Sequence, residues 1–313
     1  ADEETSGSDS TASVDSEAGS KNGTSIGNGN RATANTAAGD SASNTASSAA
    51  SSTVDGGNTI KNSRSFVFVG DNGQGDSNQK KNAEGILKYC KLEPCGFIAY
   101  MGDNFPSGVS SQEDSQFKSR FEDVYSQFDI PFYVALGNHD YMGKIQAEVD
   151  YTKTSQKWRL PSRYYSYETE FASIFVMDTI KVDQTQYDWL AKGLKAASKP
   201  WKIVYGHYPV YSSGSHGNTA ELVNKLKPIL KQYSVDFYFS GHDHDKEVIQ
   251  QDGITFVVCG TGSNPRSVSK PAADSLYTGD TLGFCHLALD EKSAKLDILG
   301  VSGASEYSKT FSK

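Results

Sequence analysis

Short apolar runs, five of which end at or next to a glycine and a polar side chain, recur along this chain and limit how it can fold. The runs are rich in β-branched and aromatic residues and occupy 65–70, 97–101, 132–136, 173–178, 201–205, 236–240, 254–258 and 284–289. Their length and composition are typical of buried strands. Helical patterns at 79–90, 115–128, 184–197 and 219–233 lie between several of them. This alternation predicts an α/β layered domain.

Metal-capable side chains follow five of these predicted strands. The five strand ends read Asp71-Asn72-Gly73, Gly102-Asp103-Asn104, Gly137-Asn138-His139-Asp140, Gly206-His207 and Gly241-His242-Asp243-His244. Ligands of α/β sheets bind at the carboxyl ends of the strands. Of six histidines, five (His139, His207, His216, His242, His244) lie in or beside these loops. A lone histidine is more often a satisfied structural residue, but five at successive strand ends predict a metal site. The mixed nitrogen and oxygen ligands suit iron, manganese or zinc better than calcium.

A metal site of this kind suits the hydrolysis of a phosphate ester. Two metal ions about 3.5–4 Å apart activate a bound water and neutralise the charge of the phosphoryl oxygens. A neutral ligand such as Asn138 limits the total negative charge, so that the site still attracts an anionic substrate. A histidine that binds no metal can hold the phosphoryl group or protonate the leaving oxygen.

The five motifs, in this order, resemble those of the calcineurin-like metallophosphoesterases. The string Gly206-His207-Tyr208-Pro209-Val210-Tyr211-Ser212, followed by His216-Gly217, is similar to the small, tartrate-resistant type of purple acid phosphatase. The resemblance covers about 65–300. It implies a four-layer αββα sandwich, in which two mixed sheets pack face to face and are flanked by helices, with the active site along one edge.

The resemblance also implies a role for each site residue. Asp71, Asp103 and His244 would hold the first metal, and Asp103 would bridge to the second metal, completed by Asn138, His207 and His242. His139 would be a catalytic residue held by Asp140, with His216 as its partner across the pocket. The implied cofactors are two metal ions, iron together with iron, zinc or manganese.

The chain departs from the purple acid phosphatase pattern at two positions, and a third position separates it from the serine/threonine phosphatases. Pro106 stands where purple acid phosphatases have the tyrosine that binds ferric iron and causes their colour, and Asn72 replaces a tryptophan. Gly73 excludes the histidine that serine/threonine phosphatases carry there. Because a proline cannot ligate, we hypothesise a colourless protein with a looser or divalent first metal and a higher pH optimum.

The first part of the chain has a different composition. Residues 1–60 contain 8 acidic and 2 basic side chains and consist mainly of Ser, Ala, Thr, Asn and Gly. Such a sequence cannot bury enough apolar surface to fold, so we predict a disordered segment over 1–62 and a catalytic domain over 63–313. Asn22 begins a lone glycosylation sequon, and the start at Ala1 suits a processed form whose signal peptide has been removed.

The four cysteines bear on the cellular compartment. Cys90 and Cys95 could close a small loop, and Cys259 and Cys285 lie in or at the end of predicted strands that could be neighbours. Two disulfides would favour a secreted or extracytoplasmic location, whereas four buried thiols would indicate no particular compartment. No apolar run approaches the length of a membrane span, and no basic stripe suggests nucleic-acid binding.

Three functions are compatible with these patterns. The first is metal-dependent hydrolysis of small phosphate monoesters, as in an acid phosphatase. The second is a phosphodiesterase or nucleotide hydrolase, because ligand motifs do not select the ester. The third is a scaffold with lost or weak activity, since the stretches 121–125, 259–260 and 284–285 resemble the glideosome-associated scaffold proteins. The oligomeric state stays open.

Overall fold

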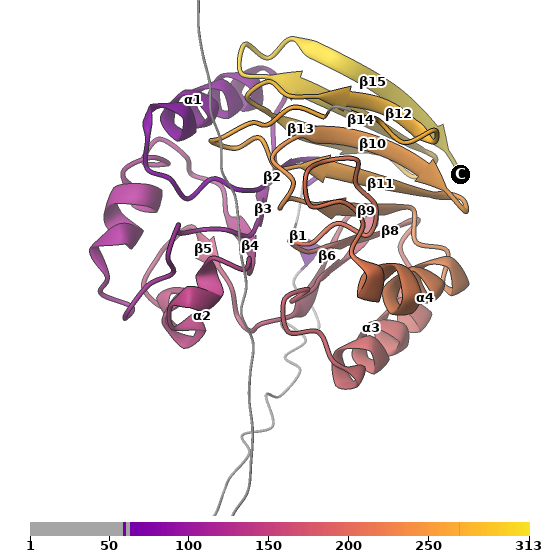
Figure 1. Ribbon diagram of the computed structural model, residues 1–313, viewed down its shortest axis with the longest axis horizontal. Helices are drawn as coiled ribbons and strands as arrows, with labels where there is room; N and C mark the ends of the chain where they lie inside the picture. The colour runs from indigo at the N-terminus through magenta and orange to yellow at the C-terminus, as the bar shows by residue number, and fades with distance from the viewer. Residues whose placement is uncertain (1–58, 61–62, 269) are drawn as a thin grey trace, which may run out of the picture. The chain divides into compact units, whose positions relative to one another are not determined.

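The computed structural model describes residues 59–60, 63–268 and 270–313 (Figure 1). The predicted disorder over 1–62 and the sequon at Asn22 therefore concern residues outside the described part, apart from Thr59–Ile60. These two residues form a short strand, β1, parallel to β6 (Tyr165–Thr169). Within the described ranges, no helix is both long and apolar enough to span a membrane.

A seven-stranded sheet has the order β15-β14-β13-β2-β3-β4-β5. Its strands are β2 (Ser65–Val69), β3 (Ile98–Met101), β4 (Phe132–Ala135), β5 (Trp158–Arg159), β13 (Gly283–Leu289), β14 (Ser293–Gly300) and β15 (Ser305–Ser312). Strands β2 to β5 are parallel, and β13 to β15 join them as antiparallel strands. The sheet is therefore mixed, as predicted.

An eight-stranded sheet has the order β1-β6-β7-β8-β9-β11-β10-β12. Its strands besides β1 are β6 (Tyr165–Thr169), β7 (Ala172–Val176), β8 (Trp201–Tyr205), β9 (Phe237–Ser240), β10 (Lys246–Gln251), β11 (Ile254–Cys259) and β12 (Ser275–Gly279). Strands β7, β8, β9 and β11 are parallel and form its centre. This sheet is mixed as well, because β10 pairs antiparallel with both β11 and β12.

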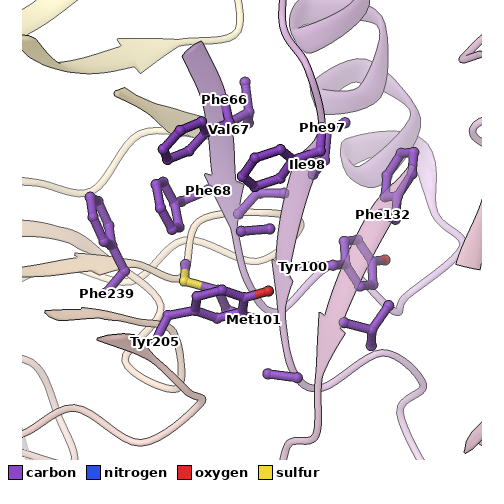
Figure 2. Close-up of a cluster of buried hydrophobic side chains, with 14 of the residues drawn as sticks. Phe66, Val67, Phe68, Phe97, Ile98, Tyr100, Met101, Phe132, Tyr205 and Phe239 are labelled. Atoms are coloured by element: carbon purple, nitrogen blue, oxygen red, sulfur yellow. The ribbon is translucent and has the colours of Figure 1, made fainter. Parts of the chain in front are cut away.

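The two sheets pack face to face through an aromatic core (Figure 2). Phe68 of β2 stacks on Phe239 of β9 with 3.6 Å between the ring centroids. Tyr205 of β8 donates from its hydroxyl to the carbonyl oxygen of Tyr133 on β4, at 2.9 Å. These contacts join one sheet to the other and confirm the predicted sandwich.

Helices flank the sheets (Figure 1). They are α1 (Ser77–Leu92), α2 (Ile145–Tyr151), α3 (Gln184–Ala196), α4 (Lys227–Gln232), π-helices at Phe117–Glu122 and Leu222–Leu226, and a 3₁₀ turn at Asp140–Met142. A second apolar cluster, which includes Leu190, Leu194 and Leu226, packs against the outer face of the eight-stranded sheet. A carboxylate caps α1 at its start, where Asp76 accepts from the backbone N–H of Gln79 at 2.8 Å.

Two disulfides join the four cysteines, as one of the two sequence-based alternatives predicts. Cys90–Cys95 closes a small loop at the end of α1. Cys259 ends β11 and Cys285 lies in β13, so their disulfide connects the two sheets rather than neighbours within one sheet. Both of these residues are fully buried.

Candidate metal centre

The central strands of both sheets end at one place. Strands β2, β3 and β4 deliver Asp71, Asp103 and Asn138, and β8 and β9 deliver His207 and His242. Backbone hydrogen bonds link these loops, because Asp71 N–H donates to the carbonyl oxygen of Gly102 at 3.1 Å and Gly241 N–H donates to that of His207 at 3.0 Å. The edge predicted from the sequence is thus a single connected site.

The backbone at this edge is strained. Asp71, Asp103 and His242 have φ angles of 59°, 53° and 69°, in the left-handed region that residues other than glycine rarely adopt. Gly102 allows the close approach, since a Cβ there would lie 2.7 Å from Nδ1 of His207. Strain of this kind persists where the surrounding structure holds a functional arrangement in place.

The six predicted ligands lie together. Nε2 of His207 is 3.3 Å from Oδ1 of Asp103 and 3.1 Å from Oδ1 of Asn138. Nε2 of His244 is 3.4 Å from Oδ1 of Asp71, and the rings of His207 and His242 are 5.1 Å apart between centroids. Ligand atoms of Asp71, Asp103 and His207 all lie within 4.8 Å of one another.

Opposite charges face each other in this cluster. Burial lowers the pKa of His207, but the Asp103 carboxylate outweighs burial and raises that pKa to about 9. Burial likewise raises the pKa of Asp103, yet His207 and the N–H of His139 bring it well below its usual range. Burial, with the nearby His207 and His216, lowers the pKa of His242 to about 3. A bound cation would replace the proton of His207, because a ligating imidazole is neutral.

The donor set fits a metal. Oδ1 of Asp71 is buried and has no hydrogen-bond partner among the described residues, as expected of an oxygen reserved for a cation. Nδ1 of His207 donates to the carbonyl oxygen of Met101 at 2.9 Å, and Nδ1 of His244 donates to that of Asn264 at 2.7 Å. These bonds leave each Nε2 facing the carboxylates, which is how ligating histidines are oriented in metal sites.

The prediction that Asp140 holds His139 is wrong. Nδ1 of His139 donates instead to the carbonyl oxygen of Pro106, at 2.8 Å, and its Nε2 lies 3.8 Å from Oδ2 of Asp103. The Asp140 carboxylate points into the protein, where it accepts from the backbone N–H groups of Gly137 and Phe105 at 2.7 and 3.1 Å. A buried carboxylate needs hydrogen-bond donors. Asp140 accepts from donors on two different site loops and so connects these loops.

His216 is held by Asp243, an aspartate for which the sequence predicts no role. Asp243 is buried and accepts from both the backbone N–H and Nδ1 of His216, at 2.8 and 2.9 Å, and from the hydroxyl of Ser212 at 2.5 Å. Burial raises the pKa of Asp243, but these hydrogen bonds hold it below its usual value. The ring of His216 lies 4.1 Å from that of His242 between centroids.

A second buried carboxyl, Glu148 of α2, lies behind the site. The side-chain amide of Asn104 donates to Oδ2 of Asp140 at 3.0 Å and to Oε2 of Glu148 at 3.2 Å, whereas Oε1 of Glu148 has no partner among the described residues. Burial and the neighbouring Asp140 raise the pKa of Glu148 well above its usual value. Asp140 accepts hydrogen bonds from three N–H groups, those of Gly137, Phe105 and Asn104, whereas Glu148 accepts only one. Because the carboxyl with fewer donors is the less stable one in its charged form, we place a proton on Glu148.

Replacing Glu148 with glutamine should change how stability depends on pH. In the wild-type protein, the unfolded chain loses the Glu148 proton near pH 4.5 while the folded chain keeps it. The free energy of unfolding should therefore fall by up to about 1.4 kcal/mol per pH unit as the pH rises toward the folded pKa. Glu148→Gln should remove this slope in urea unfolding between pH 5 and 8 with a chelator present. The exposed Glu84→Gln serves as control, and parallel curves for Glu148→Gln and wild type would contradict the protonated state.

Comparison with known proteins identifies the family of the chain. Residues 64–246 match the family model described as calcineurin-like phosphoesterase. The chain belongs to this family. It is 32% identical to tartrate-resistant acid phosphatase type 5 of Homo sapiens over 288 residues, covering 77% of this chain and 89% of the relative. It is 31% identical to purple acid phosphatase 4 of Arabidopsis thaliana over 285 residues, covering 80% and 84%.

A similar solved structure comes from a different kind of protein. GAP50, described as the anchor in the inner membrane complex of Plasmodium, superposes with a TM-score of 0.74 at 27% identity, covering 79% of this chain and 88% of that chain. The calcineurin-like phosphoesterase fold predicted from the sequence is therefore confirmed, and homology to the purple acid phosphatases implies a binuclear metal centre.

Proposed function

We propose that this calcineurin-like phosphoesterase hydrolyses small phosphate monoesters with two bound metal ions. The observation that carries the proposal is the single cluster formed by Asp103 with His207, Asn138 and the adjoining Asp71 and His244. Mixed carboxylate, amide and imidazole ligands of this kind suit a pair of transition-metal ions. When bound, the ions polarise the phosphoryl group and supply an activated water.

The six predicted ligands would divide between two ions. Asp71, Asp103 and His244 would hold the first ion, and Asp103, Asn138, His207 and His242 the second. Asp103 suits the bridging position because it lies close to ligands of both ions. Its Oδ1 is 3.3 Å from Nε2 of His207, a ligand of the second ion, and its ligand atom lies within 4.8 Å of that of Asp71, a ligand of the first ion. We propose a divalent first ion, because Pro106 offers no phenolate.

His139 and His216 would handle the substrate. In each ring Nδ1 is engaged, by the carbonyl oxygen of Pro106 or by Asp243, so that Nε2 is the nitrogen left to meet a substrate. A protonated Nε2 donates to a phosphoryl oxygen or to the leaving oxygen. The Asp243 carboxylate lies 2.9 Å from Nδ1 of His216 and so fixes the orientation of this ring.

Two chromogenic esters test the proposed reaction. The metal-loaded protein should hydrolyse nitrophenyl phosphate and act much more slowly on the bis-nitrophenyl diester. A phosphate monoester carries more negative charge than a diester, and the two histidines can donate hydrogen bonds to its additional charged oxygen. His139→Ala should lower kcat for the monoester about 10²-fold. Faster turnover of the diester would favour the phosphodiesterase alternative instead.

Asp243→Asn should slow the same reaction without unfolding the protein. The amide can still accept from Ser212, but it is a weaker acceptor than the carboxylate for the Nδ1–H group of His216. We expect kcat for the monoester to fall about tenfold or more, because the orientation of Nε2 toward the substrate is no longer fixed. Asp188→Asn, on an exposed turn of α3, is the matched control. A wild-type kcat in a folded Asp243→Asn protein would show that Asp243 does not act through His216.

A scaffold function is the second candidate. It is favoured by Pro106, which removes one family ligand, and by the likeness to GAP50. A scaffold would retain neither stoichiometric metal nor turnover that depends on Asn138, so Asn138→Ala separates the two candidates. We also propose an extracytoplasmic location, supported by the two disulfides.

A further inference from the structure

A small pocket opens beside the first half of the metal centre. Its lining residues are Asp71, Gln74, Asp103, Pro106, His139 and His244. Three of them are the predicted ligands of the first ion, His139 is the predicted substrate histidine, and Pro106 stands where the family has its iron-binding tyrosine. Gln74 is neither one of the six predicted ligands nor a predicted substrate residue.

The backbone of Gln74 is firmly held. Nη1 of Arg120 donates to the carbonyl oxygen of Gly73 at 3.0 Å and also to that of Gln74. Gly75, with a φ of 70°, donates its N–H to Oε1 of Gln79 at 2.6 Å. The loop is therefore fixed on both sides of Gln74.

The same loop is pressed against the loop of Asp103. Gly73 N–H donates to the carbonyl oxygen of Asp103 at 3.1 Å, and a Cβ at Gly73 would lie 2.4 Å from the carbonyl oxygen of Asn104. This close approach requires glycine at position 73. It brings the next residue, Gln74, to the rim of the pocket that contains Asp71 and Asp103.

The side chain of Gln74 is free to bind a ligand. Its backbone carbonyl is already engaged by Arg120, whereas its carboxamide makes no hydrogen bond with another described residue and is exposed. A carboxamide oxygen is a hard, neutral donor, of the kind that divalent ions such as Mn²⁺ accept beside carboxylates.

We propose that the carboxamide oxygen of Gln74 is the fourth protein ligand of the first metal ion and takes the place that Pro106 leaves open. This inference rests on the proposed binuclear centre. A neutral oxygen in place of a phenolate lowers the negative charge of the ligand set by one. The first site then selects a divalent ion over a ferric one, and its iron-loaded form lacks an intense visible charge-transfer band.

Titration of Mn²⁺ into chelator-treated protein, followed by calorimetry and by the electron paramagnetic resonance signal of bound Mn²⁺, tests the inference without any activity assay. Wild type should bind two ions. Gln74→Ala should weaken one of the two binding events by at least about tenfold and leave the other unchanged. Gln74→Glu, which restores an oxygen ligand, should recover the affinity. Gln127→Ala, an exposed glutamine away from the pocket, is the matched control.

The outcomes separate this inference from the proposed function. If wild type and Gln74→Ala both bind two ions with the same affinities, Gln74 is not a ligand and the binuclear centre stands. If Gln74→Glu fails to recover the affinity that Gln74→Ala loses, while thermal melting shows a folded protein, ligation by the side-chain oxygen is also overturned. If wild type binds fewer than two ions, the proposed function fails first.

Discussion

Asp103→Asn should nearly abolish turnover of nitrophenyl phosphate. The substitution keeps the shape of the side chain but removes the charge that faces His207 at 3.3 Å and, in the proposed centre, the bridge between the two ions. We expect kcat/KM to fall at least about 10³-fold, which corresponds to about 4 kcal/mol of transition-state stabilisation. Metal content should fall in parallel, because neither ion keeps its full set of ligands.

The matched control for this variant is Asp129→Asn, which changes an exposed carboxylate outside the site. It should leave turnover and metal content at wild-type levels. Retention of both ions and of most activity in Asp103→Asn would contradict a bridging role for Asp103. A similar loss in both variants would point to a general effect of net charge.

Loss of the Cys259–Cys285 disulfide should have the largest effect on stability. The bond spans 26 residues, joins the two sheets and is fully buried. The double variant Cys259→Ala with Cys285→Ala should lower the free energy of unfolding by about 3–4 kcal/mol, since closing a loop of this size restricts the unfolded chain. Urea unfolding of the two proteins under oxidising conditions measures the difference.

The other disulfide provides an internal comparison. Cys90–Cys95 spans 5 residues at the end of α1, so its removal should cost about 2 kcal/mol or less. The order of the two losses is the test. A larger loss from the Cys90 and Cys95 variant would mean that the connection between the sheets contributes little to the stability of the fold.

The sequence predicts the centre of this fold better than its edges. Strands β2, β3 and β4 are continuous apolar runs because both of their faces are buried, and such runs are easily recognised. The sequence does not predict strand β15, which lies at the edge of its sheet. Its exposed and half-buried residues alternate, and most of them are Ser, Glu, Lys or Thr. The helix predicted over 115–128 is regular only as a π-helix over Phe117–Glu122.

The site shows the same limit. Residues at strand ends could be predicted as neighbours, because the topology of a parallel sheet brings such ends together. Hydrogen-bond partners could not, since they depend on which way each side chain turns. Asp140 follows His139 directly yet points into the core, and the carbonyl of Pro106, 33 residues away, takes its place. Glu148 and Gln74 carried no motif that would have marked them.

Metal content of the purified wild-type protein, measured by elemental analysis beside its turnover of nitrophenyl phosphate, tests the central claim most directly. The clustered carboxylates, amide and imidazoles predict about two transition-metal ions per chain and hydrolysis that chelation removes and added metal restores. Protein that binds no metal after exposure to iron, manganese and zinc, and that leaves the ester intact, would contradict the account.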